Sequence, residues 1–380
     1  MSRMGIGGVE KALIAMLNAL EGRGLEVHLA LITDRGEMFR AIPAWVHVHI
    51  IKPLNRHMRL LADPKRTLAH DFMRMRWRTL PYLLPYIHKK LHKEDWKIAR
   101  RMLRHDDALG MEFDLAINYT SPYSILDYYV ARHVRARKRA AWVHFDLSRW
   151  DTNPNDIRRL HPLMDRIFIV AEHARECYCR LYPETAHKTV TFRNLVDPRS
   201  IAAEAEQPSV YRPGRGTNFV IVGRVSAEKG QDLAIRAFAG FLGGGAEGTL
   251  HIVGDGPLMD TCRALAAELC PADSVRFYGS QINPYPFMRG ADVFVQPSLQ
   301  DAFSISLAEA CLFGMPIVAT EVSGAHEMLD SRPNAIICSD FTPETMTDAL
   351  RRAAAMPHIE PDTRQDVDFS ALFDLLPPLK

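Results

Sequence analysis

Two cations follow an apolar run in the second half of the chain, at a spacing suited to an anionic ligand. The run FVIVG at 219–223 is followed directly by Arg224, and Lys229 comes five residues later, before a helical pattern. Arginine can bind two anionic oxygens through its planar fork, whereas lysine acts as a point charge. The pair predicts a diphosphate site; the alternative is a solvated surface pair, which would be preferred if R-x4-K stood alone.

Two carboxylates follow a later apolar run. Asp301 lies in a predicted loop after FVQPS, and Glu309 lies eight residues further on, within a segment of helical pattern. The first acid is expected before the helix and the second on it. They need not touch each other, and they could bind different parts of one ligand.

The first half of the chain offers two further candidates. Glycines in GIGGVEKAL at 5–13 precede a helical pattern, so that backbone N–H groups could closely approach an anion or a sugar. The alternative is a tight turn that requires positive φ. His144, in WVHFD, is the second candidate, and its alternative is a buried structural histidine.

Short β-rich runs alternate with helical patterns along the whole chain, which is typical of parallel sheets built from βαβ units. A polar stretch near residues 200–216 separates two such series and predicts two doubly wound halves, with ligands beyond the carboxyl ends of the strands. Glycines of VGDGP at 253–257 are expected to be structural. The expected strands are 26–33, 46–51, 113–118, 140–145, 166–171 and 188–193, then 219–223, 249–254, 274–279, 292–296, 315–320 and 334–339.

The opening of the chain departs from this pattern. A doubly wound domain usually begins with a strand that runs into a glycine turn, yet MGIGGVEK arrives within the first eleven residues. No room is left for a strand that would belong in the middle of the sheet. We therefore expect the native reading frame to begin upstream.

Taken together, these motifs resemble the retaining glycosyltransferases of family 4. The resemblance covers nearly the whole chain and implies the GT-B fold, an α/β architecture of two Rossmann-like doubly wound domains facing across a cleft. We place an acceptor-side domain at 1–205, a nucleotide-sugar domain at 206–358, and a tail at 359–380 that packs back on the first domain. The motifs that carry it are GIGGVEKAL, AWVHFD, NLVD at 194–197, GR…EKG, VGDGP, YGSQINPYPFMRGADVFVQPS and the two acids.

The resemblance also implies a role for each candidate. His144 matches a histidine that family members project toward the donor sugar, so it would orient a sugar hydroxyl or stabilise charge near the anomeric carbon, with Asp146 orienting it in turn. Glu309 would bind the ribose hydroxyls of the donor, while Arg224 and Lys229 would hold its diphosphate and stabilise the charge as it leaves. The first acid of the family is Glu followed by Gly, whereas this chain has Asp301 and Ala302, so the reach is one methylene shorter and the donor preference is open. The implied catalytic residues are His144, Arg224, Lys229 and Asp301; the implied donor-binding residues are Gly7, Gly8, Arg224, Lys229, Ser280, Gln281, Phe303, Ser304, Ile305 and Glu309.

The cations and the first turn of a helix can supply electrostatically what a divalent ion supplies elsewhere, so the expected chemistry needs no metal and no cofactor. We predict transfer of a hexose or N-acetylhexosamine from a UDP- or GDP-sugar to a glycan or lipid-linked glycan, with retention, in surface polysaccharide assembly. The alternative is a catalytically impaired nucleotide-sugar or glycan-binding protein. A nicotinamide oxidoreductase is disfavoured because no GxGxxG follows a strand, and a sugar phosphorylase because no pyridoxal-binding lysine can be identified.

Charge and composition limit the partners. The net charge of +2 disfavours nucleic acid, but residues 52–104 hold 15 basic and four acidic side chains, a local charge of +11. Aromatic and leucine residues interleaved with cations at 74–93 predict attraction to an anionic membrane surface, or alternatively a solvated helical pair. With six scattered cysteines and no apolar run of roughly 18 residues, we expect a cytoplasmic protein, peripheral on the inner face of the plasma membrane.

Overall fold

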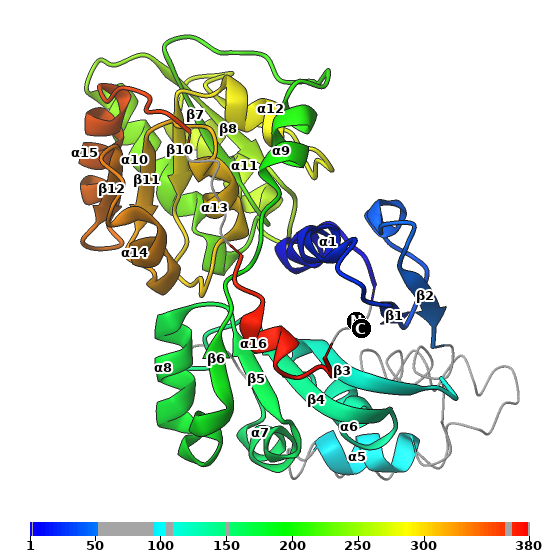
Figure 1. The fold of residues 1–380 in the computed structure, drawn as a ribbon. Coiled ribbons are helices and arrows are strands. Elements are labelled where there is room, and N and C mark those ends of the chain that lie inside the picture. Colours follow the sequence, from blue (N-terminus) through cyan, green and yellow to red (C-terminus); the bar gives the residue numbers. More distant parts are fainter. Residues whose placement is uncertain (2, 52–94, 104–108, 149–151, 362–366, 379–380) are drawn as a thin grey trace, which may run out of the picture. The chain divides into compact units, whose positions relative to one another are not determined.

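The computed structural model describes residues 1, 3–51, 95–103, 109–148, 152–361 and 367–378 (Figure 1). The chain divides into two compact units: residues 1–193 with 367–380, and residues 194–366. The predicted basic stretch at 52–104 lies mostly outside the described residues, and its membrane-binding segment at 74–93 lies wholly outside them. No helix within the described ranges combines the length and the apolar character needed to cross a bilayer.

The boundaries of the units differ from those predicted. Helix α9 (Pro198–Ala205) belongs to the second unit, where Asn283 Nδ2 donates a 2.8 Å hydrogen bond to the Glu204 carbonyl oxygen. An ion pair between Arg289 and Glu206 continues this contact. The boundary therefore lies between residues 193 and 194 rather than after 205.

The predicted tail is divided between the units. Ile359 N–H donates to the Gly314 carbonyl oxygen within the second unit, whereas residues from 367 onward belong to the first. There, just before α16 (Ser370–Phe373), the Phe369 ring lies 5.8 Å from that of Phe192, and the Arg23 guanidinium lies 4.8 Å over it.

The second unit is a six-stranded parallel sheet with the order β12-β11-β10-β7-β8-β9. Its central strands are buried along most of their length, as expected for a sheet covered by helices on both faces. Phe219, Phe238 and Phe241 join β7 to α10 in the core. The elements are β7 (Thr217–Val222), α10 (Gln231–Gly243), β8 (Gly248–Val253), α11 (Met259–Leu269), β9 (Val275–Phe277), α12 (Tyr285–Gly290), β10 (Val293–Gln296), α13 (Ile305–Cys311), β11 (Ile317–Thr320), α14 (Ser323–Leu329), β12 (Ala335–Cys338) and α15 (Pro343–Ala354).

The described strands of the first unit form two parallel sheets, β1-β2 and β3-β4-β5-β6. The Met1 ammonium donates a hydrogen bond to the Ala30 carbonyl oxygen, and Ile32 N–H donates one to the Met1 carbonyl oxygen. The first residue therefore lies beside β1. All twelve predicted strands are confirmed in the two units. The elements of this unit are α1 (Gly8–Leu20), β1 (His28–Leu31), β2 (His47–Ile50), α5 (Asp95–Met102), β3 (Glu112–Ser121), α6 (Ser124–Arg132), β4 (Arg135–Val143), α7 (Pro154–Leu160), β5 (Arg166–Ile169), α8 (Glu172–Leu181) and β6 (Thr189–Thr191).

A buried polar network lies in the core of the first unit. Asp127 Oδ1 accepts a 2.7 Å hydrogen bond from Asn118 Nδ2, and Asp127 Oδ2 lies 3.9 Å from His161 Nε2. Burial raises the pKa of Asp127 to about 7 and lowers the pKa of His161 to about 3. Both side chains are therefore held in their neutral forms near pH 6.

Candidate functional site

His144 follows β4 and is 7% exposed. Its Nε2 donates a 2.9 Å hydrogen bond to the Tyr119 carbonyl oxygen, and its ring meets the Tyr119 ring edge-on. Because Nε2 acts as donor to a carbonyl, this contact fixes the tautomer and the orientation of the ring. Asp146, which was predicted to orient His144, uses Oδ1 to accept hydrogen bonds from the backbone and the hydroxyl of Ser148.

Gly7 and Gly8 form the start of α1. Gly7 has φ of −164°, which is extended backbone, so it does not form the predicted alternative of a turn with positive φ. A Cβ at Gly7 would lie 2.4 Å from Glu10 Oε2. This glycine therefore allows the first-turn carboxylate to fold back over the start of the helix.

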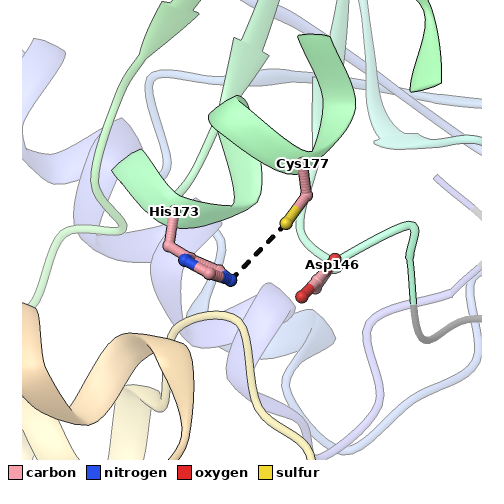
Figure 2. A group of neighbouring side chains, drawn as sticks. All are labelled: Asp146, His173 and Cys177. Carbon is pink, nitrogen blue, oxygen red and sulfur yellow. Dashed lines mark hydrogen bonds between the residues drawn. The ribbon is translucent and has the colours of Figure 1, made fainter. Parts of the chain in front are cut away.

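A second group in the first unit was not predicted. It consists of Asp146, His173 and Cys177 (Figure 2). Each residue offers one potential ligand atom, and these three atoms lie within 4.8 Å of one another. His173 and Cys177 lie four residues apart on α8, a spacing that places both on one face of the helix. The His173-x3-Cys177 spacing can be read from the sequence, but Asp146 comes from a distant part of the chain, so the sequence did not reveal the group.

In the second unit, β7 and β10 are neighbours at the point where the strand order reverses. Arg224 follows β7, and the loop from Pro297 to Ser304 follows β10. Since the strands are parallel, both segments leave the same edge of the sheet. This is the place where doubly wound sheets bind ligands.

The two loops are joined through their backbones. Leu299 N–H donates a 2.9 Å hydrogen bond to the Glu228 carbonyl oxygen. Gly230 adopts left-handed φ of 65°, and a Cβ there would lie 2.0 Å from the Pro297 carbonyl oxygen. Only glycine satisfies both conditions, so Gly230 lets the loop that carries Lys229 reach the end of β10.

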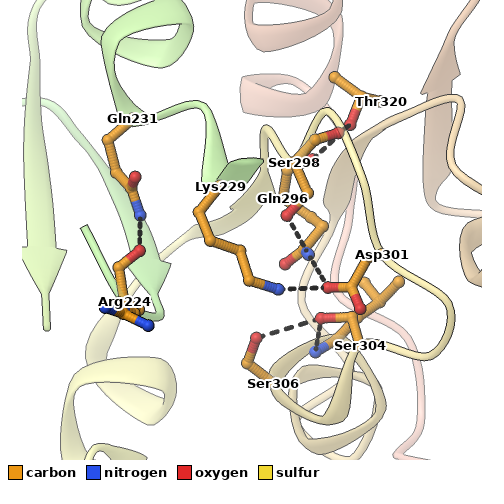
Figure 3. A network of polar contacts seen from close by, with 10 residues as sticks. Arg224, Lys229, Gln231, Gln296, Ser298, Asp301, Ser304, Ser306 and Thr320 are labelled. Carbon is orange, nitrogen blue, oxygen red and sulfur yellow. Dashed lines mark hydrogen bonds and ion pairs between the residues drawn. The ribbon is translucent and has the colours of Figure 1, made fainter. Parts of the chain in front are cut away.

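Lys229 and Asp301 form an ion pair, with Lys229 Nζ 2.6 Å from Asp301 Oδ2 (Figure 3). Gln296 Nε2 donates to the same carboxylate oxygen over 3.2 Å and to Ser298 Oγ over 2.8 Å. The two side chains, which were predicted as a phosphate ligand and a sugar ligand, therefore lie together. Gln296 is a partner that the sequence analysis missed, although the QPS motif contained it.

The guanidinium of Arg224 is exposed, but its backbone is fixed. Gln231 is 1% exposed, donates from Nε2 to the Arg224 carbonyl oxygen over 2.9 Å, and accepts from Ser226 N–H through Oε1 (Figure 3). A buried amide thus sets the course of the loop that presents Arg224. An exposed guanidinium on a fixed loop is suited to bidentate capture of phosphate oxygens.

Glu309 lies on α13 and is 2% exposed. The Tyr285 hydroxyl donates a 2.8 Å hydrogen bond to Glu309 Oε1. Burial raises the pKa of the Tyr285 phenol above its ordinary value, and the nearby Glu309 adds to this, so the phenol remains a donor. Tyr285 is a second partner that the sequence analysis missed.

The remaining predicted donor contacts lie in the same unit. Phe303, Ser304 and Ile305 are buried at the start of α13, where Ser304 Oγ accepts from Leu307 N–H as the helix cap. Near the end of β9, Ser280 is exposed and Gln281 donates from Nε2 to the Tyr278 carbonyl oxygen. Their predicted contact with the nucleotide base remains a prediction.

The VGDGP turn supports this edge of the sheet. Gly254 has φ of 146°, and a Cβ there would lie 1.8 Å from the Gly223 carbonyl oxygen, directly before Arg224. The prediction that this glycine is structural agrees with that close approach.

Comparison with known proteins finds a family match within the second half of the chain. Residues 204–368 match the family described as glycosyl transferases group 1. The lipopolysaccharide glucosyltransferase WaaG of Escherichia coli K12 is 31% identical over 150 residues, which is 38% of this chain and 40% of WaaG. A GDP-mannose-dependent alpha-(1-6)-phosphatidylinositol monomannoside mannosyltransferase of Mycolicibacterium smegmatis is 29% identical over 252 residues, 60% of this chain and 65% of that protein. Neither alignment spans two thirds of the relative.

Among solved structures, Anabaena HepE in complex with UDP-glucose matches with a TM-score of 0.64 at 16% identity, covering 93% of this chain and 88% of HepE. At that identity the likeness concerns the fold alone. Residues 204–368 thus match the glycosyl transferases group 1 family, and the chain has the α/β fold of the GT-B type.

Proposed function

We propose that the protein is a retaining glycosyltransferase that moves a hexose or N-acetylhexosamine from a UDP- or GDP-sugar to a glycan or lipid-linked glycan. The observation that carries this proposal is the pair of cations beside β7 and β10, where the strand order reverses in the part of the chain that matches the group 1 family. Arg224 and Lys229 lie there on loops joined to the segment that holds Asp301. Surface polysaccharide or glycolipid assembly is the proposed setting, since the names of two relatives refer to lipopolysaccharide and phosphatidylinositol mannosides.

Binding of the donor divides among the described residues of the second unit. Glu309, held by Tyr285, would accept hydrogen bonds from the ribose hydroxyls. The exposed fork of Arg224 and the ammonium of Lys229 would hold the diphosphate. Backbone N–H groups at the start of α13, around Ser304, would bind phosphate or sugar oxygens, because the first turn of a helix leaves such donors without intrahelical partners.

In the transfer step, the bond between the anomeric carbon and the diphosphate oxygen breaks, and the acceptor oxygen bonds to the same carbon on the same face. The acceptor proton passes to the departing diphosphate oxygen. Arg224 and Lys229 would stabilise the negative charge that develops on this oxygen, which is the work a bound metal does in other transferases. On this proposal the reaction uses no metal and no cofactor. His144 keeps its predicted role of orienting a sugar hydroxyl.

A donor screen by mass spectrometry tests the proposal directly. UDP-glucose, UDP-N-acetylglucosamine and GDP-mannose should be incubated with the protein and a panel of glycan and lipid-linked acceptors, with Glu309→Ala as the background control. We expect one donor to yield a product one sugar heavier than its acceptor, and NMR of that product should show the anomeric configuration of the donor. Inverted configuration would overturn the retaining mechanism.

The alternative function is nucleotide-sugar binding without turnover. It is favoured by the Asp301-Ala302 pair, which stands where family members have Glu-Gly, and by the engagement of Lys229 with Asp301. Saturable donor binding with neither transfer nor donor hydrolysis above the Glu309→Ala background, across the acceptor panel, would establish this alternative.

A further inference from the structure

The group formed by Asp146, His173 and Cys177 has the composition of a transition-metal site. It offers one carboxylate oxygen, one imidazole nitrogen and one thiol sulfur, all within 4.8 Å of one another (Figure 2). Zn²⁺ binds this combination of ligand types, with three protein ligands and a fourth position for water in open sites. Hard cations such as Mg²⁺ and Ca²⁺ prefer oxygen ligands alone.

Two of the three atoms already have the separation that zinc requires. His173 Nε2 lies 3.5 Å from Cys177 Sγ. Tetrahedral zinc with its usual bond lengths to nitrogen and sulfur holds those atoms about 3.6 Å apart. Since both residues lie on α8 one helical turn apart, the helix itself maintains this distance.

The third residue supplies an oxygen that no described group satisfies. Asp146 is 7% exposed, its Oδ1 accepts both hydrogen bonds from Ser148, and its Oδ2 is buried without a hydrogen-bond partner among the described residues. A buried carboxylate oxygen without a partner is costly, and such groups are normally paired or bound to metal. Ser148 also fixes the carboxylate in the way that outer partners orient metal ligands.

Cys177 has a cationic neighbour. Arg180 Nη2 lies 2.9 Å from Cys177 Sγ and donates to it from the next turn of α8. Asp146 and a Cys177 thiolate carry two negative charges, so a divalent ion makes the ligand set neutral. Arg180 then acts as an outer hydrogen-bond donor to the sulfur rather than as the sole counter-charge.

We propose that Asp146, His173 and Cys177 bind one Zn²⁺ ion, with water in the fourth position. Binding converts the Cys177 thiol to a thiolate and releases its proton to solvent. The ion would fasten α8 to the loop that follows β4, two residues beyond His144. This binding would be independent of the metal-free transfer chemistry proposed for the second unit.

Cobalt provides the most specific test, because a thiolate bound to Co²⁺ gives a sulfur-to-metal charge-transfer absorption that oxygen and nitrogen ligands do not. The protein, with any affinity tag removed, should be freed of metal and titrated with Co²⁺ and then with Zn²⁺. We expect saturation at one ion per chain, the sulfur band with cobalt, and its loss when zinc displaces cobalt.

Variants identify the ligands. Cys177→Ser should abolish the sulfur band, and His173→Ala should weaken binding by more than the 10- to 100-fold that loss of an outer partner typically costs. Cys179→Ser is the matched control, since Cys179 lies on the same helix outside the ligand set, and it should bind as the parent does. Because His173 is exposed, His173→Ala remains informative even if Cys177→Ser does not fold.

Absence of one-to-one binding, absence of the sulfur band, or its persistence in Cys177→Ser would each overturn the proposal. These results would leave the transferase proposal untouched, because the readout is metal binding rather than activity. In that case water bridging Asp146 Oδ2 would be the simpler account of the group.

Discussion

Lys229 Nζ lies 2.6 Å from Asp301 Oδ2, although the two residues are 72 positions apart in the chain. The pair is mostly screened from solvent, with 28% of the lysine side chain and 11% of the aspartate side chain exposed. A diphosphate that binds Lys229 therefore meets an ammonium whose charge is already shared with a carboxylate. Donor binding and the position of Asp301 should be coupled through this contact.

Removal of the lysine should weaken binding of the nucleoside diphosphate. A hydrogen bond to a charged group contributes about 1.5 to 3 kcal/mol, so Lys229→Ala should raise the Kd for UDP or GDP by about 10- to 100-fold. Calorimetric titration measures the change. Arg236→Ala, an exposed cation on α10, is the matched control and should leave the Kd unchanged.

Neutralising the aspartate should have the opposite effect on binding. Asp301→Asn releases Lys229 from its carboxylate, and we expect the Kd for the nucleoside diphosphate to fall, by up to about 5-fold for a partly exposed pair. Sugar transfer should fall at the same time if Asp301 positions the sugar. Weaker UDP or GDP binding in Asp301→Asn would show that the pair is needed to hold Lys229 in place.

A comparison of ligands can test the assigned role of Glu309. Glu309→Gln should raise the Kd for UDP or GDP by about 10-fold, because a charge-assisted hydrogen bond to the ribose is weakened. The 2′,3′-dideoxy form of the same nucleotide should bind the parent weakly and lose little more in Glu309→Gln. Equal losses for both nucleotides would place Glu309 away from the ribose.

The buried network of the first unit gives a prediction for pH. The pKa of Asp127 is raised to about 7 in the folded protein, whereas the unfolded chain releases this proton near pH 4. The contribution of Asp127 to the free energy of unfolding is therefore largest in acid and is lost as pH rises toward 7. His161, with its pKa lowered to about 3, stays neutral when folded, so its contribution is complete above pH 6.5 and is lost as pH falls toward 3. The two trends oppose each other between about pH 4 and 6.5.

In Asp127→Asn, the pH dependence of stability that comes from His161 should no longer be opposed by that of Asp127. We expect the urea midpoint of this variant to fall more steeply on acidification from pH 7 to 4.5 than that of the parent. Tryptophan fluorescence is selective here because all five tryptophans lie within residues 1–193. Asp114→Asn, at an exposed ion pair with Arg137, is the control and should keep the parental slope.

The sequence predicted the elements well because each strand is a short apolar run bounded by polar residues. It also predicted that Arg224, Lys229, Asp301 and Glu309 belong to one domain, since all of them follow strands or lie on the helix after them. The resemblance implied separate roles for the cations and the first acid. It could not show that Lys229 and Asp301 touch, because that contact depends on the close approach of Gly230 to Pro297.

Contacts between distant, non-consecutive elements were the part that could not be predicted. Tyr285 reaches Glu309 from another helix, and Asp146 meets α8 from the loop after β4. Neither Tyr285 nor Cys177 stands out by type, since tyrosines and buried thiols are common in cores. The domain boundary was misplaced for a related reason. By composition α9 lies in a polar linker, yet it packs against α12 and accepts a hydrogen bond from Asn283, which lies just before that helix.

Residues 367–380 complete the first unit, although the whole of the second unit precedes them in the chain. A ribosome therefore finishes residues 194–366 before it makes Phe369, the ring that covers Phe192 and Arg23. Domains generally fold as units as they emerge from the ribosome, with the earlier one first. Here the first unit is started before the second unit but is completed after it. Phe192 therefore lacks the covering ring of Phe369 throughout the synthesis of the second unit.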